Sequence, residues 1–178
     1  VKQCLLVKWW WRFGAEKKAL WRQLICSHCS HFNGSFLPLS GVCNFESRIW
    51  RDVMSMAATQ PLVVTYFLDN VKIVVGDGSS ILFWSDKWIG QSSLENQFPK
   101  LFGLSTEPHG ALKWLIDEKI ANGRWILTFK RPLRAWEEEE LLRLLQILGE
   151  GPDLRVNSED NIRWLSSPSG IFHVRSLF

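Results

Sequence analysis

The stretch that most strongly predicts a fold is VKIVVGDGSSILFW, residues 71–84. It contains two runs rich in β-branched and aromatic residues, separated by Asp77-Gly78. An Asp-Gly pair readily adopts the positive φ angles of a tight two-residue turn, and such a pair between two strand-like runs is a strong hairpin signal. The sequence therefore predicts a β-hairpin over residues 71–84. The glycines at 76 and 78 do not indicate a nucleotide-binding loop, because no third glycine, lysine or helix follows them.

On the N-terminal side of this stretch, apolar residues recur with helical spacing. The pattern predicts a helix over residues 4–13 that ends at Gly14 and a second helix over residues 16–25. Ser47 is a favourable N-cap residue, and it predicts the start of a third helix. The expected core positions of that third helix are Ile49, Trp50, Val53 and Met54.

Tryptophan is unusually common, with 11 Trp against a single Tyr. Three of them are consecutive, at positions 9–11. At 3.6 residues per turn, three adjacent side chains cover about 200° of a helix surface. One face of a two-helix unit cannot hide all three indoles. We expect this helix either to be enclosed by a further element or to expose one indole.

On the C-terminal side, Asn122-Gly123 predicts a turn before a short strand over residues 124–129. Pro132 then introduces a helix over residues 135–148, with Gly149 at its C′ position. Four glutamates occupy its first turns, where the helix dipole favours them, and we interpret them as a solvated helix start. The predicted core face of this helix consists of Trp136, Leu141, Leu144, Leu145 and Leu148.

These elements predict an α+β fold of several short Trp-rich helices around a β-hairpin, irregular and incomplete as a domain. We expect a basic, Trp-rich helical segment with a long loop over residues 1–60. Residues 61–150 would form a connector region with the hairpin and the amphipathic helix. Residues 151–178 would form a linker and two strands, 162–165 and 171–174, at the truncated start of a further domain.

Basic residues are concentrated near the N-terminus. Residues 1–51 have a formal charge of +6, residues 52–130 of −1 and residues 131–178 of −2. A positive surface attracts the phosphate backbone of nucleic acids, although scattered surface lysines produce the same charge. The candidate nucleic-acid-binding residues in the two N-terminal helices are Lys8, Arg12, Lys17, Lys18 and Arg22.

The four cysteines allow two interpretations. Cys26, Cys29, His31 and Cys43 are residue types that bind zinc. Their spacing is unfavourable, because Cys29 and His31 are two residues apart and Cys43 has no closely spaced partner. We therefore favour reduced thiols in a long loop over residues 26–46, and rank a disulfide framework below both.

Other classes of protein lack support in the sequence. The longest uncharged run, residues 23–45, contains too many polar residues for a membrane span. The chain has no HExxH, GxxxxGK[ST] or GxSxG motif, and its histidines have no nucleophile or carboxylate at a recognisable spacing. No two aspartates are adjacent, so the Asp-Asp pair with which polymerases hold two metal ions is missing. We expect no enzymatic activity, cofactor, metal or small-molecule ligand.

The ordered set of aromatic motifs resembles one family. The motifs are residues 8–14 (KWWWRFG), Leu20-Trp21-Arg22, Ile49-Trp50, residues 75–88 (VGDGSSILFWSDKW), Pro132-Leu133, Trp136-Glu137, Trp164 and residues 169–176 (SGIFHVRS). In this order they are similar to the region that follows the polymerase domain in plant LINE-type (non-LTR) retrotransposon reverse transcriptases. The match covers nearly the whole chain. It departs from the family around residues 26–45, where the family pattern has a shorter connection.

The resemblance implies a non-catalytic connector that runs into the start of a zinc-binding reverse-transcriptase domain, with the zinc ligands beyond Phe178. It implies RNA or DNA as a partner and an intracellular location, in the nucleus or the cytoplasm. Two alternatives remain from the residues alone: a stand-alone protein-interaction module that uses exposed Trp as anchors, and a small zinc-binding protein.

Overall fold

The computed structural model describes residues 2–29, 35–38 and 47–177, with side chains from Leu5 onward, and has an α+β fold. The chain divides into two units. Unit 1 comprises residues 1–74 and 161–178, and unit 2 comprises residues 75–160. Unit 2 is thus an insertion between the two parts of unit 1. This division differs from the three consecutive segments that the sequence predicts, because the C-terminal segment pairs with residues far earlier in the chain.

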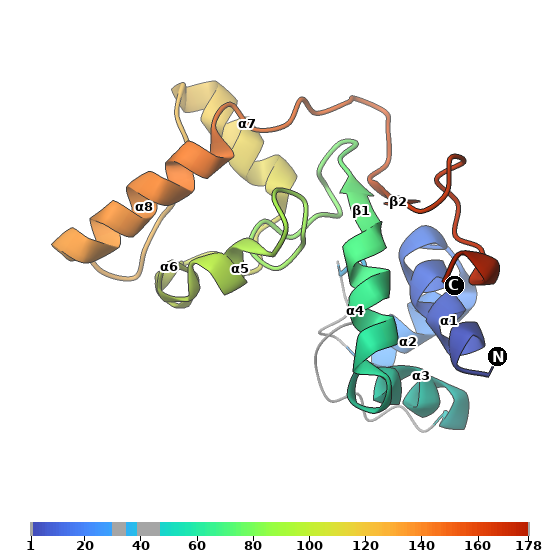
Figure 1. Cartoon of the computed structure of the whole chain (residues 1–178). Helices are drawn as coiled ribbons and strands as arrows, with labels where there is room; N and C mark the ends of the chain where they lie inside the picture. The colour runs from blue at the N-terminus through green and yellow to red at the C-terminus, as the bar shows by residue number, and fades with distance from the viewer. Residues whose placement is uncertain (1, 30–34, 39–46, 178) are drawn as a thin grey trace. The chain divides into compact units, whose positions relative to one another are not determined.

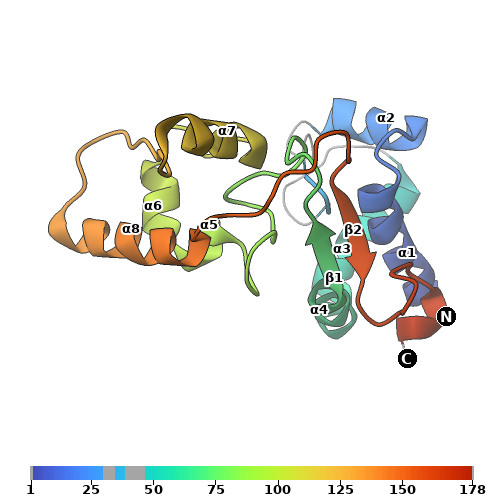
Figure 2. The ribbon, with the colours of Figure 1, turned by 90° about the horizontal axis from the view of Figure 1, so that it is seen from above.

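Unit 1 is built on a two-stranded antiparallel sheet that α1 and α4 contact, as Figures 1 and 2 show. The described elements are α1 (Lys2–Ala15), α2 (Leu20–His28), α3 (Arg48–Thr59), α4 (Pro61–Asn70), β1 (Val71–Val74), β2 (Asn161–Trp164) and the 3-10 helix η2 (Val174–Leu177). The Ser47 hydroxyl accepts a hydrogen bond from the Trp50 amide, which confirms the predicted N-cap of α3. Ile49, however, is exposed and Met56 is buried, so the core face of α3 is rotated from the predicted one.

The predicted hairpin over residues 71–84 is wrong. β1 pairs with β2, with Val71 opposite Trp164 and Val74 opposite Asn161. Gly78 does have the expected positive φ of 74°. The chain after β1 does not form a second strand, because the amide groups of residues 76, 78 and 80 donate to the carboxylate of Asp160, each at 2.8 Å.

The C-terminal strand expected over residues 171–174 is also not formed. The Trp164 amide donates to the Gly170 carbonyl at 2.8 Å, which closes a tight turn. The chain then enters η2 instead of continuing as a strand. The strand that pairs with β2 is β1, which lies about 90 residues earlier in the sequence, and not the segment that directly follows β2.

Each of the three consecutive tryptophans of α1 packs against a different part of unit 1. Trp10 is 1% exposed, and Trp9 and Trp11 are half-buried. The ring centroid of Trp9 lies 5.3 Å from that of Trp21. The indole nitrogen of Trp10 donates to the Val53 carbonyl at 3.1 Å. The ring of Trp11 stacks on Phe172, with 5.8 Å between centroids. The first of the two expected arrangements is therefore present, and no indole of this run is exposed.

Gly14 lies inside α1, which corrects the prediction that it ends the helix. A side-chain carbon at this position would lie 2.6 Å from Ile162 Cδ1 and 2.8 Å from the Phe36 carbonyl oxygen. Contacts this short are not tolerated between unbonded heavy atoms. Glycine therefore allows α1 to approach both β2 and the segment 35–38 closely.

The substitution Gly14→Ala is expected to lower the free energy of unfolding by about 1–3 kcal/mol, because the backbone carbonyl of Phe36 would have to move. This outcome is opposite in sign to helix propensity, which favours alanine by about 1 kcal/mol. Gly103, in helix α6 (Pro99–Leu104), has open space around it and provides the control. Gly103→Ala should be neutral or stabilising, and urea unfolding of both variants would test the pair. Equal midpoints would contradict the close-approach explanation.

Unit 2 contains the remaining described helices, α5 (Leu94–Gln97), α6 (Pro99–Leu104), α7 (Leu112–Asn122) and α8 (Ala135–Leu148). Phe83 is fully buried and packs against Trp84 and Trp88 at centroid distances of 5.2 and 5.8 Å. The predicted bounds of α8 and its end at Gly149 are confirmed. No strand forms over residues 124–129 in the described structure, where Phe129 makes only an isolated bridge to Ser105.

Candidate nucleic-acid interface

Formal charge separates between the two units. Unit 1 has eleven Lys and Arg against four Asp and Glu, a formal charge of +7. Unit 2 has ten Lys and Arg against fourteen Asp and Glu, a formal charge of −4. A positive charge of this density attracts polyanions through release of their counterions. Unit 1 is therefore the part of the chain in which a nucleic-acid interface is to be sought.

Two of the five predicted residues, Lys8 and Lys18, have exposed side chains. A third, Arg12, is engaged within unit 1. Its guanidinium binds both carboxylate oxygens of Glu16, at 2.6 and 2.9 Å, and lies 4.6 Å from the Trp9 ring centroid. The hydrogen bond from Arg12 holds the pKa of Glu16 below its ordinary value. The charge of Arg12 is thus largely compensated before any ligand binds.

Arg22 and Lys17 also have structural contacts. Arg22 is 8% exposed, donates to the Ser35 carbonyl at 2.9 Å and packs over the Phe13 ring at 4.6 Å. Burial lowers the pKa of Arg22 from its ordinary value. The Lys17 ammonium lies 3.7 Å from the centroid of the Phe36 ring. The structure therefore does not present the five predicted residues as one free basic surface.

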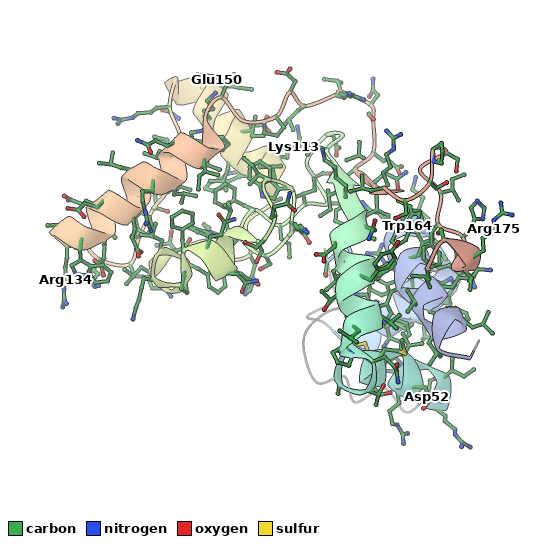
Figure 3. The ribbon with its side chains drawn as sticks, viewed as in Figure 1. Asp52, Lys113, Arg134, Glu150, Trp164 and Arg175 are labelled. Atoms are coloured by element: carbon green, nitrogen blue, oxygen red, sulfur yellow. The ribbon has the colours of Figure 1, made fainter. Side chains whose placement is uncertain are left out.

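Sequence reasoning missed five other exposed cations of unit 1, which lie outside the first two helices. Arg175, on η2, points away from the ribbon in Figure 3. These five cations are Arg48, Arg51, Lys72, Arg163 and Arg175. For Lys72 and Arg163, exposure could have been predicted, because each stands between apolar residues in a strand and side chains alternate between the two faces. The pairing that brings Lys72 and Arg163 together could not be predicted, because the two residues are far apart in sequence.

A separate cavity of about 350 Å³ lies in unit 2, next to the start of α8 that Arg134 marks in Figure 3. Its lining includes Lys100, Leu104, Arg131, Arg134, Trp136 and Glu137. Glu137 is 2% exposed and accepts two hydrogen bonds from the Arg131 guanidinium, at 2.7 and 2.8 Å, and one from the Arg134 amide at 2.8 Å. For Glu137 the expectation of a solvated glutamate run is wrong, because this carboxylate caps the helix start and binds Arg131. Trp136, expected in the core, is 44% exposed.

Glu137→Gln should remove part of the acid sensitivity of the chain. Hydrogen bonds from Arg131 and the Arg134 amide lower the pKa of Glu137 from 4.5 to about 2. The resulting stabilisation is present above about pH 4.5 and is lost as the pH falls towards 2. The urea midpoints of wild type and variant should therefore differ most above about pH 5 and converge near pH 2. Glu138→Gln, in the same turn but exposed, is the control and should show no such convergence.

The structure corrects the interpretation of the cysteines as reduced thiols for Cys29, whose sulfur is in a disulfide. Cys26 is not in a disulfide, and burial raises the pKa of its thiol. No group of three or more His, Cys, Asp or Glu side chains in the described part of the chain is arranged to hold a metal ion. His31 and Cys43, the other two candidate ligands, lie outside the described residues.

None of the described helices combines the length and the apolar character needed to cross a bilayer. Comparison of the whole chain with known proteins found no matching family model, no matching curated protein and no matching solved structure.

Proposed function

We propose that this chain is a non-catalytic connector of the kind that follows the polymerase domain in LINE-type reverse transcriptases, and that its unit 1 contacts nucleic acid. The observation that carries the second part is the separation of charge, +7 in unit 1 against −4 in unit 2. The family resemblance rests on the ordered aromatic motifs of the sequence.

The acidic residues of unit 1 are too few to neutralise its surface. Glu16 is already bound by Arg12, and Asp52 and Asp69 are exposed without a salt bridge among the described residues. Exposed cations on α1, α3, the sheet and η2 therefore retain their charge. Phosphate groups are the ligand that such a surface favours, and their binding should depend strongly on salt.

The test is fluorescence anisotropy of the full chain with a labelled single-stranded RNA at about 50 and 200 mM salt. For four phosphate contacts the affinity should fall about fifty-fold between the two concentrations. Lys8→Gln combined with Lys18→Gln should weaken binding. Arg124→Gln combined with Arg155→Gln removes the same charge from exposed positions of unit 2 and should leave binding unchanged. Absence of salt-sensitive binding, or a larger effect of the unit 2 variant than of the unit 1 variant, would refute the proposal.

A protein-interaction module is the second candidate, and it is favoured only in unit 2. Trp114 and Trp136 are each 44% exposed, whereas the tryptophans of unit 1 are buried or half-buried. Trp136 lines the cavity beside α8. Exposed Trp next to a cavity is typical of binding hot spots. Loss of a co-purifying protein in the Trp136→Ala variant, with RNA binding unchanged, would favour this second function.

A further inference from the structure

The two faces of the β1–β2 sheet differ sharply in character. Val71, Ile73, Ile162 and Trp164 are buried on one face. The opposite face is exposed and carries Lys72 directly across from Arg163. Because side chains alternate along a strand, both cations project from the same surface. The centre of this exposed sheet face is therefore occupied by two like charges.

Like charges directly opposite each other on neighbouring strands are destabilising. The salt bridges among the described residues involve neither Lys72 nor Arg163. Neighbouring positions on this face supply no carboxylate, since Val74 lies opposite Asn161 and Leu165 follows β2. Folding of the sheet therefore gains nothing from this pair, and a polyanion is the kind of partner that would compensate it.

The side chain of Arg163 lies against the turn that follows β2. Gly170 has a φ of 72°, and a side-chain carbon there would lie 2.8 Å from Arg163 Cγ and 3.0 Å from its Nε. The turn is closed by the hydrogen bond from the Trp164 amide to the Gly170 carbonyl. The aliphatic part of the Arg163 side chain thus lies over Gly170. This arrangement reduces the freedom that the guanidinium would lose on binding.

We infer that the exposed face of the β1–β2 sheet binds the phosphate backbone of a single-stranded nucleic acid through Lys72 and Arg163. This inference rests on the proposed nucleic-acid contact of unit 1 and assigns it to a surface. An Arg guanidinium matches phosphate geometry with two parallel hydrogen bonds, and a lysine adds a point charge. Val74 and Leu165, 37% and 53% exposed, offer apolar contacts to the unstacked bases of a single strand.

The experiment compares two double variants of the full chain that remove the same charge from unit 1. One is Lys72→Gln with Arg163→Gln on the sheet, and the other is Arg48→Gln with Arg51→Gln on α3, where both side chains are exposed. RNA affinity is measured by anisotropy as a function of salt. Loss of two phosphate contacts on a single strand should lower the slope of log affinity against log salt by about 1.4 for the sheet variant. The α3 variant should change the slope by less than half of that.

Thermal unfolding provides a readout that separates binding from folding. Lys72→Glu converts the like-charged pair into an ion pair and should raise the melting temperature by about 1–3 °C while it weakens RNA binding. A variant that is more stable and binds less RNA would support the inference, because misfolding cannot explain it.

Several outcomes would overturn the inference. Equal changes in slope for the sheet and α3 variants would refute it and leave the nucleic-acid proposal intact. Absence of salt-sensitive RNA binding by the wild-type chain would refute both. Tighter binding to a duplex of the same length, or binding to anionic phospholipid vesicles without binding to RNA, would show that the face serves another partner.

Discussion

Replacing Trp164 with alanine is expected to lower the free energy of unfolding by about 3–5 kcal/mol. Trp164 is fully buried at the end of β2 and contacts aromatic rings from three other elements or segments. Their centroid distances from Trp164 are 6.4 Å for Trp11, 6.3 Å for Tyr66, 5.6 Å for Phe67 and 4.9 Å for Phe172. Alanine would leave a cavity that these rings cannot fill, because each is held by its own helix or turn.

The same site allows a sharper comparison with phenylalanine. The indole nitrogen of Trp164 is buried and has no hydrogen-bond partner among the described residues, whereas that of Trp10 donates to the Val53 carbonyl. Trp164→Phe therefore loses packing only, and it should cost less than Trp10→Phe, which also loses the hydrogen bond from the indole to the Val53 carbonyl.

The measurement is urea unfolding followed by circular dichroism. Trp114→Ala is the control, because Trp114 is 44% exposed on α7, and its removal should change stability by less than about 1 kcal/mol. If Trp164→Ala and Trp114→Ala had the same midpoint, the aromatic cluster would not be the core of unit 1.

Replacing Asp160 with alanine is expected to lower the free energy of unfolding by about 2–4 kcal/mol. Its carboxylate is 2% exposed and accepts hydrogen bonds from the amides of Gly76, Gly78 and Ser80. A buried amide without an acceptor costs about 1–3 kcal/mol. Three amides lose their acceptor together in this variant. Water molecules that enter the space left by the carboxylate would offset part of this loss of stability.

Asp160→Asn tests whether both carboxylate oxygens are needed. Oδ1 accepts from Gly76 and Gly78, and Oδ2 accepts from Ser80. The amide group of asparagine would place a donor against one of these donors, so this variant should also be destabilised, although its shape is conserved. Asp153→Asn, at an exposed position of the same segment, is the control.

Hydrogen exchange would show where the loss occurs. Faster exchange of the amides of residues 76, 78 and 80 in the Asp160 variants, with exchange in α8 unchanged, is the expected result. Unchanged protection of these three amides would mean that Asp160 does not organise the loop.

Features that depend on neighbours in sequence could be predicted. Ser47 caps α3 because its hydroxyl reaches an amide three residues away, and α8 ends at Gly149 as expected. Gly78 has the positive φ expected for an Asp-Gly pair, because that angle is a local property. The strand expected after Gly78 is absent, and the amides of Gly76, Gly78 and Ser80 donate to the distant Asp160 carboxylate instead.

The candidate interface also combines features that depend on sequence neighbours with features that depend on distant residues. The excess of basic residues could be counted from the sequence, but not which of them are free. Arginine is usually found on a helix surface, but Arg22 is buried against Phe13. Arg12 is bound by Glu16, one helical turn later. Only the Arg12–Glu16 pair had a local signal, namely the i, i+4 spacing.

Composition and short-range periodicity were enough to predict an α+β chain that is rich in Trp and basic near its N-terminus, because both are local properties. The pairing of β1 with β2, and with it the position of Lys72 opposite Arg163, became known from the three-dimensional structure alone. Two strands can pair at any separation in the sequence, and 86 residues of unit 2 lie between these two. The burial of Ile162 against α1, and of Trp164 against α1 and α4, selected that partner in preference to the nearest turn.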